Sequence, residues 1–228
     1  DISNEPFKFY TAEKILKGKK LFLIQHGGSY GTSENFPIEK IQTKIADKFF
    51  SWGWKNNKKV IPFCFQKHLF SAEVEQTKKN KGIIIPTTEF HKCPVDVTGG
   101  RPRYKNELDS YIDDIVIFTE KLDDKYKKKV SIKYLDERNT DYVKKSIYYA
   151  HPKLKFFKSK KNTYEMNFKI SIETCNSTGF LEGMLLNHPV ILIVNKKYSL
   201  IRKSAKKYFK RLHDVKIVHY SANEAASF

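Results

Sequence analysis

The chain has 228 residues, of which 40% are hydrophobic and 14% aromatic, enough to bury a core and too many for a disordered chain. Its formal net charge is +18, but only five of its 43 basic residues are arginine, the residue preferred for bidentate recognition of phosphates and bases. The excess of lysine therefore favours compositional drift and solubility over an anionic membrane or polymer surface, and it disfavours a nucleic-acid partner. No apolar run approaches the roughly 18 residues of a membrane-spanning helix.

Cysteine usage bears on the cellular compartment. The three cysteines share no close spacing, and their odd number fits a reducing compartment, so we expect a cytoplasmic protein. Neither a CxxC nor an HExxH pattern occurs, and no metal site is predicted.

The first residue is Asp1 rather than Met, and a capping-box pair, Ser221 and Glu224, opens a helix just before the last residue. We interpret the chain as a fragment of a longer protein.

The first part of the chain carries the pattern of one α/β unit. The predicted elements are helices over 5–18 and 37–49 and strands over 20–25, 50–54 and 60–63. The strand over 20–25 is a continuous apolar run of the buried type. The helix over 37–49 is amphipathic, with Ile38, Ile41, Ile45 and Phe49 on the face expected to be buried. The polar, lysine-rich residues 66–81 are the predicted linker.

A second unit follows the linker. The predicted strands lie over 82–86, 129–135, 169–173, 190–194 and 215–219, and the predicted helices lie over 104–121, after the turn 176–179, and over 199–213. Residues 136–161 are polar and predicted to be irregular. Because strands alternate with helices of 10–15 residues, we predict α/β architecture with two doubly wound parallel units joined near residues 66–81.

His26 lies where the first buried strand ends and a loop with three glycines in six residues begins, His-Gly-Gly-Ser-Tyr-Gly. Ligands of open α/β sheets bind beyond the carboxyl ends of strands, and glycines let a ligand approach the backbone. A histidine there could accept a proton from an attacking hydroxyl. The alternative is a turn whose histidine is only hydrogen-bonded within the fold. The loop is neither a P-loop nor a dinucleotide fingerprint.

The turn Asn176-Ser-Thr-Gly179 separates a predicted strand from a predicted helix. The free N–H groups at such a helix start form an anion site suited to a phosphate. Ser177 or Thr178 could instead only cap the helix, with Glu182 at a distance compatible with a capping box. Capping and phosphate binding can also coexist.

Further candidates are more isolated in the sequence. His151, in a His-Pro pair, could donate to a phosphate, and Arg101 with Arg103 could clamp one in a glycine-proline loop. Trp52 and Trp54 are interpreted as packing residues rather than as a platform for sugar stacking. The chain contains no Asp-x-Asp pair, which one large class of sugar transferases uses to chelate a metal, and no Gly-x-Ser-x-Gly elbow of serine hydrolases.

Three segments in combination resemble a known family. Gln25-His-Gly-Gly-Ser-Tyr-Gly-Thr32, the Trp-Gly-Trp segment that ends Ile45–Trp54, and Asn176-Ser-Thr-Gly-Phe-Leu-Glu182 are similar to motifs of the LIC-type family of surface-polysaccharide transferases. The stretch Leu200–Phe209 also fits, and the resemblance covers most of residues 20–228. More distantly, the order of the motifs resembles that of glycerophosphate polymerases and bacterial polysialyltransferases.

The resemblance implies a GT-B-like fold, in which two Rossmann-like units face a cleft. Residues 1–80 would be the end of an incomplete acceptor-side unit with its linker, and residues 81–228 the donor-nucleotide unit. His26 would be the base, and Ser177, Thr178 and Glu182 would contact the donor. His151 would be a further donor contact, but its match to the family's motifs is weaker. The remaining motif residues would form the acceptor-side loop: Gln25, Gly27, Gly28, Tyr30 and Gly31.

The leading hypothesis is a cytoplasmic transferase without cofactor or metal. It would move a sugar or polyol-phosphate from a nucleotide-activated donor to a glycan or lipid-linked acceptor, with peripheral contact to an anionic inner membrane. Two alternatives stay open at this stage. One is a sugar-nucleotide epimerase of the same fold, and the other is a non-catalytic basic module that binds a membrane surface or nucleic acid.

Overall fold

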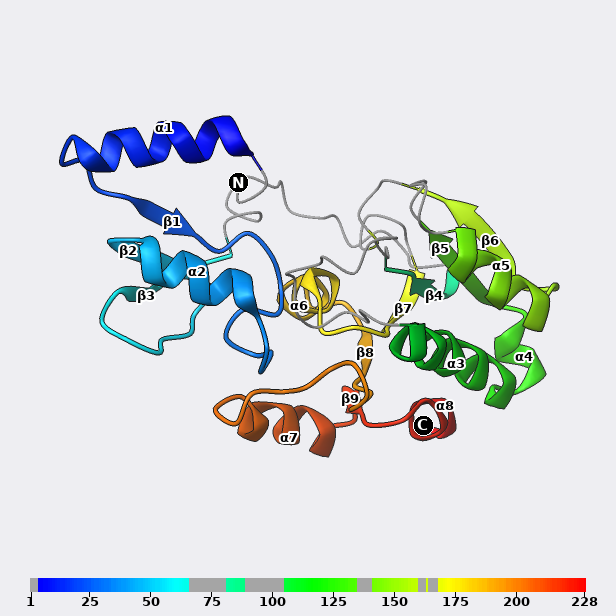
Figure 1. The fold of residues 1–228 in the computed structure, drawn as a ribbon. Helices are drawn as coiled ribbons and strands as arrows, with labels where there is room; N and C mark the ends of the chain where they lie inside the picture. Colours follow the sequence, from blue (N-terminus) through cyan, green and yellow to red (C-terminus); the bar gives the residue numbers. More distant parts are fainter. Residues whose placement is uncertain (1–3, 66–80, 89–104, 135–140, 160–162, 164–167) are drawn as a thin grey trace.

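The computed structural model describes residues 4–65, 81–88, 105–134, 141–159, 163 and 168–228, and it contains two parallel β-sheets with flanking helices (Figure 1). The α/β prediction is therefore confirmed. The predicted linker lies outside the described residues except for its last position, and so does the loop with Arg101 and Arg103. Within the described part of the chain, no helix has the length and apolar character needed to cross a membrane.

The first sheet belongs to residues 4–65, here called the N-terminal unit. Its parallel strands, in the order β1-β2-β3, are β1 (Phe22–Ile24), β2 (Lys48–Ser51) and β3 (Val60–Pro62). Helix α2 (Pro37–Ile45) connects β1 to β2, and a small core forms around Tyr30, Phe36 and Phe49. Helix α1 (Glu5–Leu16), capped by Asn4, buries none of its side chains and lies at the edge of the unit (Figure 1).

Two expectations for this unit are wrong. The run expected to be a fully buried strand exposes 60% of Phe22, because β1 is an edge strand of a sheet with only three strands. Ile41 and Ile45 are also exposed, whereas α2 buries Ile38, Glu39 and Thr43. The helix therefore turns a partly polar face inward, and the contacts of Glu39 described below explain why.

The second sheet belongs to residues 81–228, here called the C-terminal unit. Its strands are β4 (Lys81–Pro86), β5 (Val130–Tyr134), β6 (Lys155–Lys158), β7 (Phe168–Glu173), β8 (Val190–Ile193) and β9 (Val218–His219). All pairs are parallel, in the order β6-β5-β4-β7-β8-β9. Numbered within the unit, this is the 3-2-1-4-5-6 order of the Rossmann-like doubly wound sheet. The topology therefore reverses between β4 and β7, which is where such sheets bind ligands.

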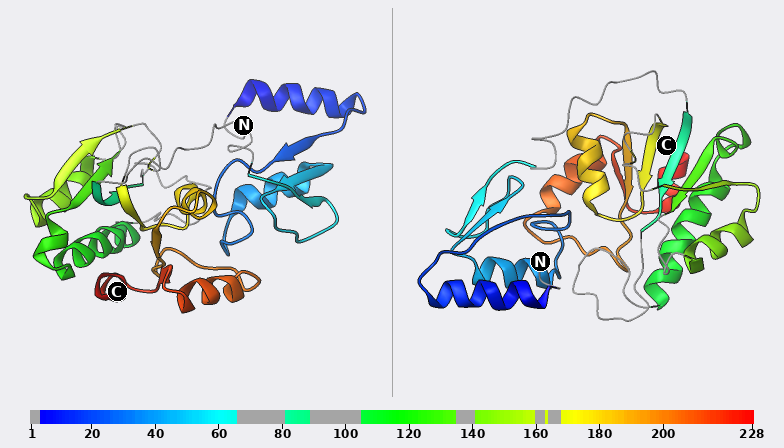
Figure 2. Two further views of the ribbon diagram at one scale, coloured as in Figure 1. Left: turned by 180° about the vertical axis from the view of Figure 1, so that it is seen from behind. Right: turned by 90° about the horizontal axis from the view of Figure 1, so that it is seen from above.

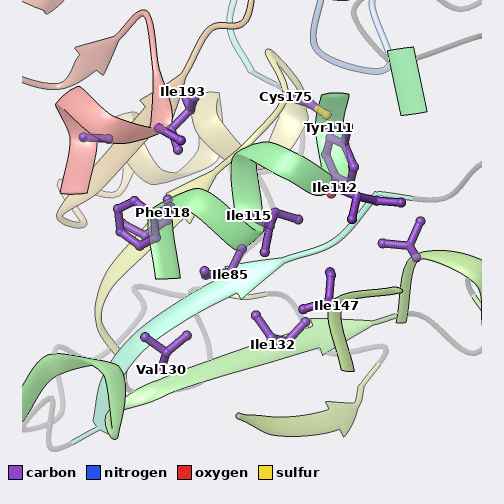
Figure 3. Close-up of a cluster of buried hydrophobic side chains, with 14 of the residues drawn as sticks. Ile85, Tyr111, Ile112, Ile115, Phe118, Val130, Ile132, Ile147, Cys175 and Ile193 are labelled. Carbon is purple, nitrogen blue, oxygen red and sulfur yellow. The ribbon is translucent and has the colours of Figure 1, made fainter. Parts of the chain in front are cut away.

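Helices cover both faces of this sheet. One face carries α3 (Lys105–Lys121), α5 (Asp141–Ala150) and α8 (Ala222–Ser227), with the short α4 (Asp124–Lys127) beyond α3, and the other carries α6 (Thr178–Leu185) and α7 (Lys206–Asp214) (Figures 1 and 2). Figure 3 shows the larger core, in which Ile115 of α3 faces the strands and shares one cluster with Ile85 and Ile193. Each buried isoleucine contributes about 1.5–3 kcal/mol relative to an exposed one.

The segment predicted to be irregular, residues 136–161, contains α5 and β6. The prediction is wrong because the apolar pattern of both elements is weak. Helix α5 buries Val143 and Ile147 while exposing Tyr142, Tyr148 and Tyr149, so large aromatic residues on its exposed face obscure the apolar period. Strand β6 is an edge strand, and its sequence Lys-Phe-Phe-Lys offers only two apolar residues.

Of the last two helices, α7 is shorter than predicted, whereas α8 begins where it was predicted. The helix predicted over 199–213 begins only at Lys206, because residues just before it pair with the N-terminal unit: Ile201 forms a β-bridge with Ser33. At the start of α8 the N-cap bond of the predicted capping box is confirmed, whereas the reciprocal bond comes from the residue before the cap. The Oγ of Ser221 accepts the N–H of Glu224 at 3.2 Å, and the Glu224 carboxylate accepts the N–H of Tyr220 at 3.0 Å.

Candidate active site

The side chain of Gln25 connects the glycine-rich loop to the Trp-Gly-Trp segment. It is 1% exposed, and its Nε2 donates to the carbonyl of Gly27 at 2.8 Å. Its Oε1 accepts the backbone N–H of Trp52 at 2.9 Å and the indole N–H of Trp54 at 2.8 Å. Because Trp54 is hydrogen-bonded and packs on Phe49, the packing interpretation of this tryptophan holds. Gln25 therefore holds the backbone of the glycine-rich loop next to the Trp-Gly-Trp segment.

His26 is exposed at the start of the loop and makes one hydrogen bond through its ring. Its Nδ1 lies 3.0 Å from the hydroxyl of Tyr30, and that hydroxyl donates to Oε1 of Gln42 at 2.7 Å. Partial desolvation by the surrounding atoms lowers the pKa of His26 from its ordinary 6.5. Burial raises the pKa of Tyr30, which is 2% exposed and stays protonated. At neutral pH the imidazole is therefore uncharged and able to accept a proton.

Gly28 and Gly31 are required by contacts within the protein. A Cβ on Gly28 would lie 2.4 Å from the carbonyl carbon of Ser177 and 2.5 Å from the backbone nitrogen of Thr178. Gly31 has a φ of +71°, and a Cβ there would lie 2.5 Å from the ring of Trp54. At Gly28, the space that the sequence predicts for a ligand is thus filled by the turn of the C-terminal unit.

The turn before α6 grips this loop through three hydrogen bonds. The N–H of Gly28 donates to Oγ1 of Thr178 at 2.8 Å, and Oγ of Ser29 donates to the carbonyl of Asn176 at 2.7 Å. The side-chain amide of Asn176 donates to Oγ1 of Thr32 at 2.9 Å. Two residues predicted to contact a phosphate, Asn176 and Thr178, therefore hold the loop that carries the histidine.

Ser177 is the N-cap residue of α6, but its side chain makes no capping hydrogen bond. The predicted capping box with Glu182 is therefore wrong. Among the described residues no partner for the Ser177 hydroxyl is found, and this side chain lines a cavity. Of the four residues of the turn, Ser177 is thus the one whose side chain is available to a ligand.

That cavity, of about 210 Å³, lies at the reversal point of the sheet between the carboxyl ends of β4 and β7. Its hydroxyl-bearing lining consists of Thr87, Thr88, Thr163, Thr174, Ser177 and Thr178. The carboxylate of Glu173, which is 5% exposed, accepts the hydroxyl of Ser171 at 2.8 Å. A Cβ on Gly179 would lie 2.9 Å from Oε2 of Glu173. The carboxylate therefore occupies the amino terminus of α6, the point at which the sequence predicts a phosphate.

A buried polar network of Tyr111 and Asp114 on α3 and of Tyr198 contacts two residues that line the cavity. The hydroxyl of Tyr198 donates to Asp114 at 2.7 Å and lies 3.2 Å from the carbonyl of Thr174. The hydroxyl of Tyr111 accepts the N–H of Thr88 at 3.0 Å. Burial raises the pKa of the Asp114 carboxyl. Both rims of the cavity, Thr88 after β4 and Thr174 after β7, are thus held by tyrosines of the core.

An ion pair between the partly exposed Arg202 and the buried Glu39 joins the two units beside the loop. Nη2 of Arg202 lies 2.9 Å from Oε1 of Glu39, and Oε2 of Glu39 accepts the N–H of Gly31 at 2.7 Å. Arg202 also donates to the carbonyl of Ser33 at 3.2 Å. Sequence reasoning missed Glu39, Arg202, Gln42 and Glu173. Only Arg202 had a signal, because it lies in the stretch Leu200–Phe209 that resembles the family.

Of the other predicted residues, His151 is described and is not brought to this place. Nε2 of His151 lies 3.4 Å from the carbonyl of Val116 and 3.9 Å from the carboxylate of Glu120, both in the second half of α3. His151 directly follows α5 and comes four residues before β6 begins, so it lies toward the amino ends of the strands, opposite the cavity. Arg101 and Arg103 lie outside the described residues.

A larger cavity, of about 960 Å³, also opens at the amino ends of the strands, with Lys129, Lys155 and Lys169 in its lining. The smaller cavity is the better candidate site. Ligands of doubly wound sheets bind at the carboxyl ends, and the histidine loop is hydrogen-bonded to the turn at that edge. Among the described residues no cluster of three or more His, Cys, Asp or Glu side chains could hold a metal ion.

Comparison with known families settles the class of protein. The model of a family described as LIC12162 family transferase matches residues 2–228, nearly the whole chain. The chain belongs to this family. The motif with His26 and the turn with Ser177 are therefore parts of a transferase. No curated protein matches this transferase in sequence.

Proposed function

We propose that this transferase moves a sugar or polyol-phosphate group from a nucleotide-activated donor to a hydroxyl of a cell-surface glycan or lipid-linked acceptor. The observation that carries the proposal is a neutral, exposed His26 on a loop that is hydrogen-bonded to the turn lining the switch-point cavity. The two units would then act as the acceptor-side and donor-side parts of a GT-B-like pair. The protein would work in the cytoplasm, with peripheral contact to the inner face of the membrane, where the charge of +18 is compatible with anionic lipids.

The donor would bind in the cavity with its hydroxyl-bearing part innermost. The Glu173 carboxylate repels a phosphate but accepts hydrogen bonds from hydroxyl groups, and most of the lining is itself hydroxyl-bearing. The donor phosphate would lie further out, at the free hydroxyl of Ser177 and on the side of His26. Negative charge at Glu173 thus sets the direction in which the donor enters.

In the proposed reaction, His26 accepts the proton of the acceptor hydroxyl as its oxygen attacks the group to be transferred. The bond between that group and the nucleotide breaks, and the nucleotide phosphate leaves with the electron pair. The absence of an Asp-x-Asp pair in the sequence motivates a mechanism without a metal. Charge on the leaving phosphate would then be met by hydrogen-bond donors and basic side chains.

The test begins with a thermal-shift screen of CMP, CDP, UDP and GDP on the protein, followed by calorimetry with the best ligand. Ser177→Ala should weaken binding about 10- to 150-fold, since a hydrogen bond to a charged group contributes about 1.5–3 kcal/mol. His26→Ala should leave binding nearly unchanged and lower transfer by about 10²–10⁴. Failure of all four nucleotides to bind, or wild-type turnover by His26→Ala, would contradict the proposal.

The same experiments separate the two alternatives. An epimerase would release nucleotide and free sugar, or interconvert donors, in the absence of an acceptor. A non-catalytic basic module would bind anionic vesicles or nucleic acid with a strong dependence on salt and no dependence on His26. Neither alternative is favoured by a contact of the site.

A further inference from the structure

The hydrogen bonds around Tyr30 have a direction that determines where the proton of His26 lies. The Tyr30 hydroxyl has a single hydrogen and is buried between the ring of His26 and the amide of Gln42. The atom of Gln42 that faces it, at 2.7 Å, is the oxygen Oε1, which can only accept. Tyr30 therefore donates to Gln42, and toward His26 it can only accept.

It follows that Nδ1 of His26, 3.0 Å from that hydroxyl, carries a hydrogen. A neutral imidazole has one N–H, so Nε2 bears the lone pair. His26 is an exposed residue at the start of the loop, and of its two ring nitrogens only Nδ1 makes a hydrogen bond within the described residues. Protonation at Nε2 would produce an imidazolium whose Nδ1–H already has its acceptor.

We infer that Gln42 is a positioning residue that, through Tyr30, holds His26 in the tautomer with Nε2 free to accept a proton. This inference deepens the proposed function, because it explains how the base would be kept ready. The tautomer itself depends only on the hydrogen-bond chain and can be measured without a substrate.

The placement of Gln42 depends in turn on the inward polar face of α2. Glu39 and Thr43 of this helix are buried, and Glu39 is fixed by the N–H of Gly31 and by Arg202. Gln42 follows Glu39 by three positions, so it lies on the same side of the helix. The contact between the units thus sets the rotation of α2, and this rotation points Gln42 at Tyr30.

The experiment uses the whole chain labelled with ¹⁵N-histidine, with the His26 signals identified by their loss in His26→Ala. In the wild type, at a pH where the ring is neutral, Nδ1 should give the shift of a protonated nitrogen and Nε2 that of a bare one. Gln42→Leu removes the acceptor and frees Tyr30 to donate to Nδ1, so the tautomer should reverse and transfer should fall tenfold or more. Gln42→Glu keeps an acceptor and should preserve the wild-type tautomer.

Tyr30→Phe provides a second test that leaves Gln42 in place: it should give a mixture of both tautomers. A wild-type spectrum with hydrogen on Nε2 would overturn the inference, and so would unchanged His26 shifts in a folded Gln42→Leu. A melting curve for each variant separates loss of the fold from loss of the tautomer. If the tautomers behave as expected while His26→Ala retains transfer, the proposed base is wrong but the positioning by Gln42 stands.

Discussion

Two neighbouring glycines of the histidine loop should lose very different amounts of stability on the same substitution. Gly28→Ala places a Cβ 2.4 Å and 2.5 Å from backbone atoms of Ser177 and Thr178, which cannot rotate away. Gly27→Ala places a Cβ 3.4 Å from the Thr178 hydroxyl, close to an ordinary contact. The pair therefore isolates the close approach of the two units from the general effect of replacing a glycine.

The magnitude for Gly28→Ala follows from the contacts that must separate. Carbon atoms prefer about 3.5–4.0 Å, so the loop and the turn must move apart by about 1 Å. Overpacking of this kind costs about 1–3 kcal/mol. The separation also weakens the 2.8 Å bond from the Gly28 N–H to Thr178, which contributes about 0.5–1.5 kcal/mol. We expect a total of about 2–4 kcal/mol, against less than about 0.5 kcal/mol for Gly27→Ala.

Thermal unfolding measures the difference. For a chain of this length, each kcal/mol lowers the melting temperature by about 2–4 °C, so Gly28→Ala should melt about 4–16 °C below the wild type. Affinity for a nucleotide should fall as well, because Ser177 lines the cavity and moves with the turn. Equal melting temperatures for the two variants would refute the close packing of the loop on the turn.

Three further predictions concern charged groups. Arg202→Met leaves the Glu39 carboxylate, which is 3% exposed, without its cation, and should lower the free energy of unfolding in urea by about 3 kcal/mol. Adding Glu39→Gln should recover part of this loss. Unchanged stability of the single variant would count against the ion pair. Burial raises the pKa of Asp114, so the folded chain holds this proton more tightly than the unfolded chain, and stability falls as pH rises from the ordinary 3.8 through the raised value. Asp114→Asn should flatten that part of a plot of melting temperature against pH, and a plot identical to the wild type would argue against it. Because the pKa of His26 is lowered, the transfer rate should rise with pH through a midpoint below 6.5, and a midpoint above 6.5 would exclude His26 as the group that titrates.

Much of the C-terminal unit could be predicted from the sequence, since its signals are local. The apolar runs of β4 and β8 and the helical period of α3 each depend on neighbours a few residues away. The alternation of strands and helices then implies a parallel sheet. Placing His26 and the turn 176–179 after strands was also local reasoning, and parallel strands bring such positions to the same edge of a sheet.

What the sequence could not reveal are contacts between residues distant in the chain. Gly28 and Thr178 are 150 positions apart, and nothing in the loop indicates that its glycine accommodates a backbone rather than a ligand. Periodicity also cannot say which face of a helix will be covered. On α2 it favoured the isoleucines, but the Gly31 N–H and Arg202 draw Glu39 inward and leave Ile41 exposed.

By itself, therefore, the amino-acid sequence determined the α/β class, most elements of the C-terminal unit and the two motifs of the candidate site. Only the tertiary structure decided how those motifs are used. In the folded chain, Thr178 and Asn176 hydrogen-bond to the loop, while the Ser177 hydroxyl lines the cavity. Glu173 lies at the start of α6, and Gln42 accepts the hydroxyl of Tyr30, which contacts His26. The physical reason is that hydrogen-bond partners and steric contacts depend on distance in space, which spacing along the chain does not encode.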